Sequence, residues 1–216
     1  MCGRYSLSPQ QVDLKQLFLL EELPEIQTRY NIAPTQQAPI VHLRDDRRVC
    51  TSMRWGLQPK WMKTEQRPLI NARVETVNEK PSFRNAFRKR RCMVPATGYY
   101  EWVRQEGLKQ PVHIHMADHQ VFSFAGLWEQ GPNGSSYTII TTEASDGLSS
   151  VHHRMPLVLE PMLFSRWLDH DLDPDEALEL LNTCAPPALS ITEVSTAVNS
   201  VRNDGPHLVA PLGTTR

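Results

Sequence analysis

The fold class is decided by one stretch of the chain, RCMVPATGYYEWVRQEGLKQPVHIHMADHQVFSFAGLWEQGPNGSSYTIITTEA at residues 91–144. It contains a series of strand-like runs rich in β-branched and aromatic residues, at 91–96, 99–104, 110–116, 121–129 and 135–144. Glycine, proline, asparagine and aspartate separate these runs at short intervals. Because short turns join antiparallel neighbours, the stretch predicts a β-rich core whose strands are mostly antiparallel.

The segments on either side extend this sheet. Residues 38–44 and 48–57 flank the charged turn RDDRR, which predicts a β-hairpin, and residues 188–196 predict a final strand. No composition shift or linker divides the chain. We therefore expect one α+β domain, dominated by strands, over residues 1–216.

Helices are predicted at residues 14–22, 81–91, 162–168 and 173–184. Ser8 and Pro9 form the expected cap and first position of the earliest helix. In the second, Phe83 and Phe87 form a buried edge, and the basic residues Arg84, Arg88 and Arg91 share a flank.

Composition and charge exclude several classes of protein. The chain has 216 residues, 40% hydrophobic and 22% charged, with a formal net charge of -1. Any nucleic-acid binding must therefore come from a local basic patch. No segment supplies the roughly 20 apolar residues of a membrane span, and the start lacks the apolar core of a signal peptide. These features predict a cytoplasmic protein without membrane contact.

The four cysteines, Cys2, Cys50, Cys92 and Cys184, are far apart and form no CxxC pair. This spacing argues against a zinc site and against a disulfide framework. We expect reduced thiols, no bound metal and no cofactor.

The chain begins MCGRY, and removal of Met1 would expose the amine of Cys2. An α-amine has a reference pKa of about 7.7 to 8.0, so far more of it is unprotonated near neutral pH than of a lysine. With the adjacent thiol it forms a 1,2-aminothiol. Such a pair can attack an aldehyde, first as a Schiff base and then by closing a five-membered thiazolidine ring, an intramolecular step.

Two other interpretations of this start remain open. Cys2 can be a small residue packed at a chain end, the usual fate of cysteine. Class II glutamine amidotransferases also expose a mature N-terminal cysteine before glycine, and its thiol attacks a glutamine amide. The arginine-glycine-proline-aspartate stretch expected of those enzymes is absent from the sequence.

Further motifs accompany MCGRY, namely RYNIAP (29–34), LINARVET (69–76), GYYEW (98–102), VHHRMP (151–156) and VNSVRND (198–204). Together they closely resemble the SOS response-associated peptidase (SRAP) family, over about residues 2–211. The resemblance implies a β-rich α+β fold with a central cleft, binding of single-stranded DNA, and covalent capture of abasic sites through Cys2. The open-chain sugar of an abasic site is the aldehyde that an aminothiol needs.

The resemblance also implies roles for particular residues. Glu101 of GYYEW resembles the catalytic acid/base. His152 of VHHRMP resembles the group that assists opening of the sugar ring, with His153 as its immediate rival. Asn71 of LINARVET resembles a residue that hydrogen-bonds near the reacting centre, and the role of Glu75 in the same motif stays open. Without the resemblance, each would be interpreted as an ordinary surface, turn or structural residue.

Contacts to DNA are expected from Arg4, Arg73 and Arg154, each within two residues of a proposed catalytic group. Trp61 is expected to stack on a base. Relatives often carry a second aromatic residue at the next position, where this chain has Met62. The resemblance therefore does not predict how strong the stacking is, whereas the capture chemistry does not depend on this position. A solvated arginine or a core tryptophan is the structural alternative for each of these residues.

The leading functional prediction is therefore an enzyme that captures abasic sites, acting as a monomer on single-stranded DNA. The alternative is an N-terminal-nucleophile protease or amidase that uses the Cys2 thiol and removes Met1 itself. A third prediction is a non-catalytic reader of modified bases, which would behave equally with a blocked terminus.

Overall fold

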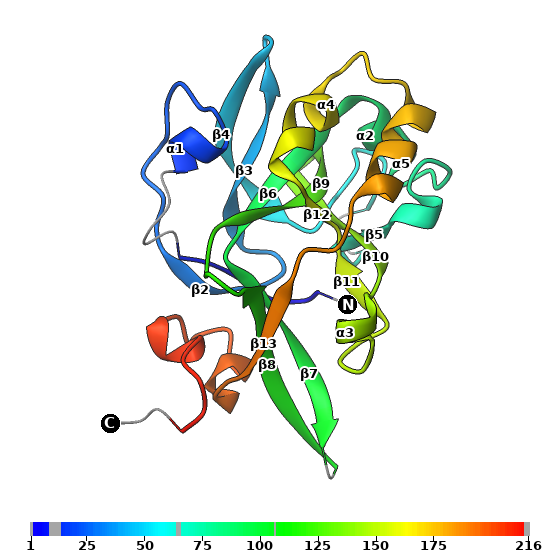
Figure 1. Cartoon of the computed structure of the whole chain (residues 1–216). Coiled ribbons are helices and arrows are strands. Elements are labelled where there is room, and N and C mark those ends of the chain that lie inside the picture. Colours follow the sequence, from blue (N-terminus) through cyan, green and yellow to red (C-terminus); the bar gives the residue numbers. More distant parts are fainter. Residues whose placement is uncertain (1, 9–13, 64–65, 106, 214–216) are drawn as a thin grey trace.

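In the computed structural model, which describes residues 2–8, 14–63, 66–105 and 107–213, the strands form two sheets (Figure 1). The smaller sheet has the order β13, β8, β7, β1, β2. Its strands are Leu189–Glu193, Leu108–Met116, Gly98–Gln105, Tyr5–Leu7 and Arg29–Ile32.

The larger sheet has the order β11, β10, β4, β3, β6, β9, β12, and β5 pairs with β10. Because β10 also pairs with β9, the strands β10, β4, β3, β6 and β9 close into a barrel-like ring. In the order of the sheet, with β5 last, its strands are Arg154–Pro156, Gly134–Glu143, Arg47–Trp55, Gln37–Arg44, Arg91–Ala96, Phe122–Gly131, Val158–Leu159 and Asn71–Arg73.

These sheets confirm the predicted β-rich α+β fold. Among the described residues, β10 pairs in parallel with β4 and β5, and the other strand pairs are antiparallel. The predicted hairpin is β3–β4, and its turn residues Asp45 and Asp46 have φ values of 49° and 58°. Two-residue hairpin turns need positive φ, which aspartate tolerates. The central cleft remains a prediction.

Short helices lie around the barrel. Each predicted helix is present in some form, although the first covers only Leu14–Leu17, and Pro9 of its expected cap lies outside the described residues. The helices, including 3-10 turns (η), are α1 (Leu14–Leu17), η1 (Val74–Thr76), α2 (Arg84–Lys89), α3 (Asp146–Ser149), η2 (Pro161–Leu163), α4 (Phe164–Leu168), α5 (Pro174–Thr183), η3 (Thr196–Asn199) and η4 (Pro206–Leu208).

The prediction that Arg91 shares a helix flank with Arg84 and Arg88 is wrong. Helix α2 ends at Lys89, and Arg91 is the first residue of β6 and is buried. Its guanidinium donates to the backbone carbonyls of Phe87 and Trp167, both at 2.8 Å. These two carbonyls lie in the last turns of α2 and α4, where no later residue of the helix can donate to them. Orphan carbonyls at helix ends are favourable partners for a buried cation.

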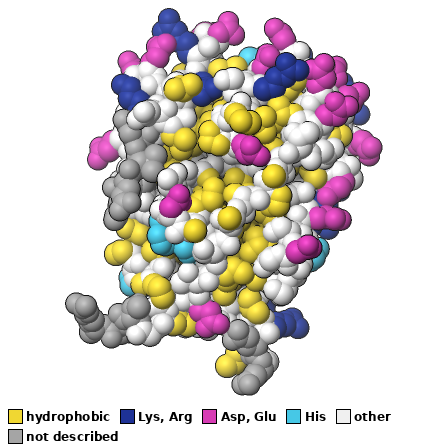
Figure 2. Space-filling view, viewed as in Figure 1, with side chains coloured by type: hydrophobic (Ala, Val, Ile, Leu, Met, Phe, Trp, Pro, Cys, Tyr) yellow, Lys and Arg dark blue, Asp and Glu magenta, His cyan; other side chains and the backbone are white. Residues whose placement is uncertain are grey.

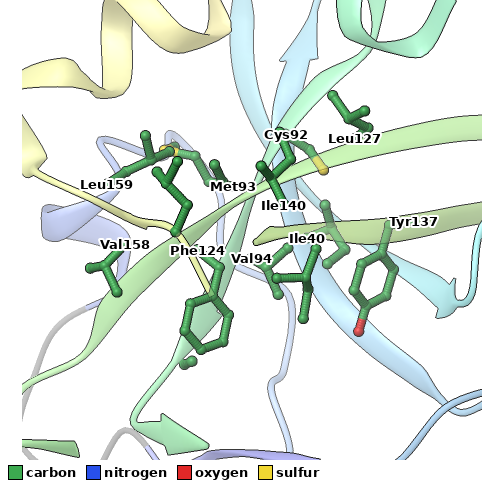
Figure 3. Packing of buried hydrophobic residues seen from close by; sticks show 14 of the residues in the cluster. Ile40, Cys92, Met93, Val94, Phe124, Leu127, Tyr137, Ile140, Val158 and Leu159 are labelled. Carbon is green, nitrogen blue, oxygen red and sulfur yellow. The ribbon is translucent and has the colours of Figure 1, made fainter. Parts of the chain in front are cut away.

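One hydrophobic core joins both sheets. Figure 3 shows side chains from β3, β6, β9, β10 and β12 packed against one another inside it. Tyr5 of β1 reaches this core: its ring lies 5.2 Å from that of Trp55, and its hydroxyl lies 2.7 Å from that of Tyr137. The packing of Tyr5 anchors the start of the chain where the two sheets meet.

On the face seen in Figure 2, hydrophobic atoms gather across the middle, and charged side chains lie mainly around the edges.

Strand β6 passes into β7 at Thr97, so consecutive strands belong to different sheets. The residue after Thr97 is Gly98, and the lack of a side chain there leaves room for the His113 ring. A Cβ atom at this position would lie only 2.2 Å from Nε2 of His113. Strand β7 then runs beside β1 and carries the GYYEW motif toward the start of the chain.

Candidate active site

Cys2 is fully buried at the junction of the two sheets. The side-chain amide of Asn71, on β5 of the larger sheet, donates a hydrogen bond of 2.9 Å to the backbone carbonyl of Cys2. The thiol of Cys2 donates to the carbonyl of Arg4, with an S···O distance of 3.8 Å. Both the carbonyl and the sulfur of Cys2 thus have a partner, the first in the larger sheet and the second in the backbone just before β1.

The register of β1 against β7 brings Glu101 to Cys2. Tyr5 pairs with Tyr99, and the amide of Tyr100 donates to the carbonyl of Arg4 at 2.9 Å. Continuing this register by two residues places Gly3 opposite Glu101. Since side chains alternate along a strand, Tyr99 and Glu101 share a face, and Glu101 is only 6% exposed.

The electrostatics of this corner keep the thiol protonated. Burial raises the pKa of the Cys2 thiol well above its usual value, and the nearby carboxylate of Glu101 raises it further. Burial also raises the pKa of Tyr99, with contributions from Cys2 and Glu101. A thiol in this setting forms little thiolate at neutral pH.

Strand β10 brings the other predicted residues to one place. It pairs with β5 on one side, where Thr141 lies opposite Arg73, and with β11 on the other, where Glu143 lies opposite Arg154. The LINARVET and VHHRMP motifs therefore flank the same strand. The hydrogen bond from Asn71 links this group to Cys2.

The side chain of Arg154 is committed to protein partners. Its guanidinium binds both carboxylate oxygens of Glu75, at 2.5 and 3.0 Å, and donates to the carbonyl of Thr141 at 2.6 Å. The Arg154 side chain is 7% exposed and that of Glu75 46% exposed. The partner of Glu75, which the sequence left open, is thus Arg154.

His152 lies in the turn before β11, stacked on His153 with ring centroids 4.3 Å apart. The backbone N–H of Arg154 donates to Nδ1 of His152 at 2.9 Å, and the carbonyl of Arg154 lies 3.2 Å from the same nitrogen. His153 is exposed. Desolvation lowers its pKa, and the charges of Arg154 and Arg73 are among the other causes.

The remaining predicted DNA contacts differ in setting. Arg73 is exposed beside the histidine pair, and the Trp61 side chain is 60% exposed on the loop between β4 and β5. Arg4 instead donates to Asn31 of β2 at 2.7 Å and to the carbonyl of Val198 in the C-terminal segment at 2.8 Å. The DNA contacts assigned to all of these arginines stay predictions.

Two residues of this region were not assigned from the sequence. Tyr99 shares the electrostatic environment of Cys2 and Glu101, and Asn31 is a fully buried amide in β2. A signal existed for both, because each lies inside a motif that was recognised, GYYEW and RYNIAP. The alternation along a strand also puts Tyr99 on the face of Glu101.

Within the described ranges, no three His, Cys, Asp or Glu side chains lie close enough to share a metal ion. None of the described helices is long and apolar enough to cross a membrane. The corner does bring together the side chain of Cys2, a buried carboxylate, an amide and an adjacent histidine pair. These residue types can transfer protons and hold a nucleophile.

Comparison with known proteins agrees with the fold and the motifs. A family model described as "SOS response associated peptidase (SRAP)" matches residues 1–201. The chain therefore belongs to the SRAP family.

Several relatives are named for one activity. The chain is 36% identical over 221 residues to "abasic site processing protein YoqW" of Bacillus subtilis, covering 97% of this chain and 99% of that protein. It is 33% identical to YedK of Escherichia coli, which bears the same description, covering 98% and 100%. It is 35% identical to HMCES of Gallus gallus, again so described, covering 85% of this chain and 66% of that protein.

Solved structures share the fold. A protein from Bacteroides thetaiotaomicron superposes with a TM-score of 0.74 at 26% identity, covering 97% of this chain and 99% of its own. A phage-related protein from Bordetella bronchiseptica has a TM-score of 0.74 at 28% identity, covering 89% and 94%.

Proposed function

We propose that this protein binds single-stranded DNA and captures abasic sites covalently through Cys2, after removal of Met1. The names of its relatives support action on abasic sites. The single observation that carries the chemical proposal is the setting of Cys2, which is fully buried, held by Asn71 and placed beside the Glu101 carboxylate.

The reaction has two steps. The Cys2 amine attacks the C1 aldehyde of the opened sugar, and loss of water gives an imine. The thiol then adds to the imine carbon: a C–S bond forms, and the π electron pair of the C=N bond moves to nitrogen, which takes up a proton. The product is a thiazolidine, formed with release of one water overall. The ring shields the lesion from strand breakage because the aldehyde no longer exists.

The site residues divide the proton transfers between them. Glu101 accepts and returns the protons that move as amine becomes imine, because it is the carboxylate closest in register to the terminus. His152 assists opening of the sugar ring, with His153 stacked on it. Asn71 holds the Cys2 carbonyl and so orients the amine.

DNA is held beside this corner by exposed groups. Arg73 follows Ala72 on β5, two residues from Asn71, and its exposed guanidinium is suited to a phosphate. The exposed Trp61 offers a face for a base, an interaction of about 1 to 3 kcal/mol in single-strand binders. Arg4 and Arg154 contribute chiefly to the structure around the site.

A mass spectrum tests the proposal directly. Untagged protein is incubated with an oligonucleotide bearing one abasic site, and the expected product is the chain without Met1 plus the oligonucleotide minus one water. Cys2→Ala should abolish the SDS-stable adduct. Cys2→Ser should keep an imine that borohydride traps but lose the stable product. A chain that retains Met1 and still forms the stable adduct would refute the proposal.

A protease or amidase that uses the Cys2 thiol remains the alternative, and the family description contains the word peptidase. That chemistry needs a ready thiolate, whereas burial and Glu101 raise the pKa of this thiol. Turnover of a peptide or of glutamine without DNA would support the alternative. Capture of an aldehyde without such turnover supports the proposal above.

A further inference from the structure

We propose that Asn31 and Arg4 are positioning residues that, together with the loop 198–203, orient the Cys2 thiol for ring closure. We call Asn31, Arg4 and residues 198–203 the clasp. The inference rests on the proposed function and deepens it, because it assigns separate structural supports to the two chemical steps.

Asn31 is the centre of the clasp. It is fully buried in β2, and its amide nitrogen lies 3.2, 3.0 and 2.9 Å from the carbonyls of Val198, Ser200 and Asn203. Its amide oxygen accepts a hydrogen bond of 2.7 Å from Arg4. One side chain thus connects Arg4, directly before β1, with the end of η3 and the residues that follow it.

Arg4, the residue directly before β1, completes the clasp. Besides Asn31, its guanidinium donates to the carbonyl of Val198 at 2.8 Å and to that of Asn199 at 3.2 Å. These acceptors replace part of the hydration that the cation loses where it is partly buried. The C-terminal segment lies beside β2 and the smaller sheet in Figure 1, where the clasp can hold β1 in place.

The backbone of Arg4 transmits this restraint to the thiol. Its carbonyl accepts the amide N–H of Tyr100 at 2.9 Å and also the thiol of Cys2 at 3.8 Å. Gly3, which is conformationally permissive, is the sole residue between Cys2 and Arg4. A fixed Arg4 carbonyl therefore gives the sulfur a preferred direction that Gly3 cannot supply.

The carbonyl of Cys2 has a separate support, because Asn71 holds it from β5. The amine step depends on the backbone of Cys2, whereas ring closure also depends on the direction of the sulfur. In closure the S–H bond breaks, the C–S bond forms, and nitrogen gains the proton while the C=N bond becomes single. Loosening the clasp should therefore slow the second step more than the first.

The test separates the two steps with one substrate. Borohydride present from the start traps the imine and measures the first step. Without borohydride, accumulation of an adduct that survives heat and SDS measures ring closure. Affinity is measured on an oligonucleotide whose abasic analogue lacks the aldehyde, so that binding is separate from reaction.

The variants are Asn31→Ala and, in case it fails to fold, the milder Arg4→Lys. Lysine keeps the charge but loses the forked donors that reach Asn31 and the loop carbonyls. Asp173→Ala is the matched control, since it removes the cap of α5 and leaves the clasp intact. All variants are compared at a temperature at which circular dichroism shows each one to be folded.

We expect both clasp variants to slow ring closure on the order of 10-fold, because small misplacements of a reacting group have large rate effects. The trapped imine and the affinity for the analogue should stay within about 2-fold of wild type, and Asp173→Ala should match wild type in both steps. If Arg4→Lys weakens affinity and leaves the ratio of the two steps unchanged, Arg4 is a phosphate contact and the clasp is refuted. Equal slowing of both steps by Asn31→Ala refutes it too. If wild type forms no adduct, the proposed function itself fails.

Discussion

Replacing Arg154 by alanine should destabilise the protein, whereas the same change at Arg73 should weaken DNA binding. The two arginines lie on strands that flank β10, yet one is buried against Glu75 and the other is exposed. The pair therefore tests whether position in the sequence motif or the side-chain environment decides the role of each arginine.

The magnitude follows from the contacts of Arg154. Its hydrogen bond to the carbonyl of Thr141 is charge-assisted, and such bonds contribute about 1.5 to 3 kcal/mol. The Glu75 side chain is 46% exposed, so water can rehydrate it and the ion pair adds about 1 kcal/mol or less. We expect Arg154→Ala to lower the free energy of unfolding by about 3 kcal/mol. For the exposed Arg73, the loss should stay below about 0.5 kcal/mol.

The assay combines urea unfolding with fluorescence anisotropy on a single-stranded oligonucleotide at several salt concentrations. Arg73→Ala should reduce the steepness of the log affinity against log salt plot by about 0.7, the value for one phosphate contact on single strands. Arg154→Ala, measured where it is still folded, should leave that slope unchanged. An Arg154→Ala protein with wild-type stability and a shallower salt slope would refute the reasoning and restore the DNA contact expected from the sequence.

Further predictions concern the buried histidine beside β1 and the exposed tryptophan. Gly98→Ala should lower the free energy of unfolding by about 1 to 3 kcal/mol, because the added Cβ would lie 2.2 Å from the His113 ring. Urea unfolding measures this change, and a variant as stable as wild type would show that the packing around Gly98 is looser than the structure indicates. Burial holds the pKa of His113 down at about 3, whereas an unfolded histidine titrates near 6.5. Between these two pH values the unfolded state binds more protons than the folded state. The free energy of unfolding should therefore be highest above about pH 6.5 and should decrease by up to about 1.4 kcal/mol for each unit by which the pH is lowered below that value. Denaturation curves at pH 7 and 5 check this sign, and His113→Gln should flatten the dependence. Trp61→Ala should weaken binding to single-stranded DNA by about 1 to 3 kcal/mol without changing the unfolding midpoint, and unchanged affinity would remove Trp61 from the interface.

The elements that were predictable have local causes. The strands of the stretch 91–144 appear as β6 to β10 because alternation and turn residues act over a few neighbours. The prediction that Arg91 lies on the same helix flank as Arg84 and Arg88 was wrong, because helical spacing cannot reveal that α2 ends at Lys89. The closure of the barrel was equally hidden, since pairing of β10 with β4 joins segments that lie far apart in the chain.

The same division holds for the candidate site. The motifs pointed to Cys2, Asn71, Glu101 and His152, and the aminothiol of Cys2 stays a prediction that depends on removal of Met1. Their roles in catalysis stay predictions. The burial that raises the pKa of the Cys2 thiol and the partner of Glu75 come from the folded structure alone.

By itself, the sequence determined the alternation of strands and turns and the family motifs, including the MCGRY stretch that contains Cys2, because each of these depends on neighbouring residues. Only the tertiary structure decided what surrounds that residue. The bond from Asn71 to Cys2 spans 69 positions, that from Arg154 to Glu75 spans 79, and that from Arg4 to Val198 spans 194. Contacts of this range form when two sheets share one core, and no local pattern specifies which distant side chain a buried polar group will meet.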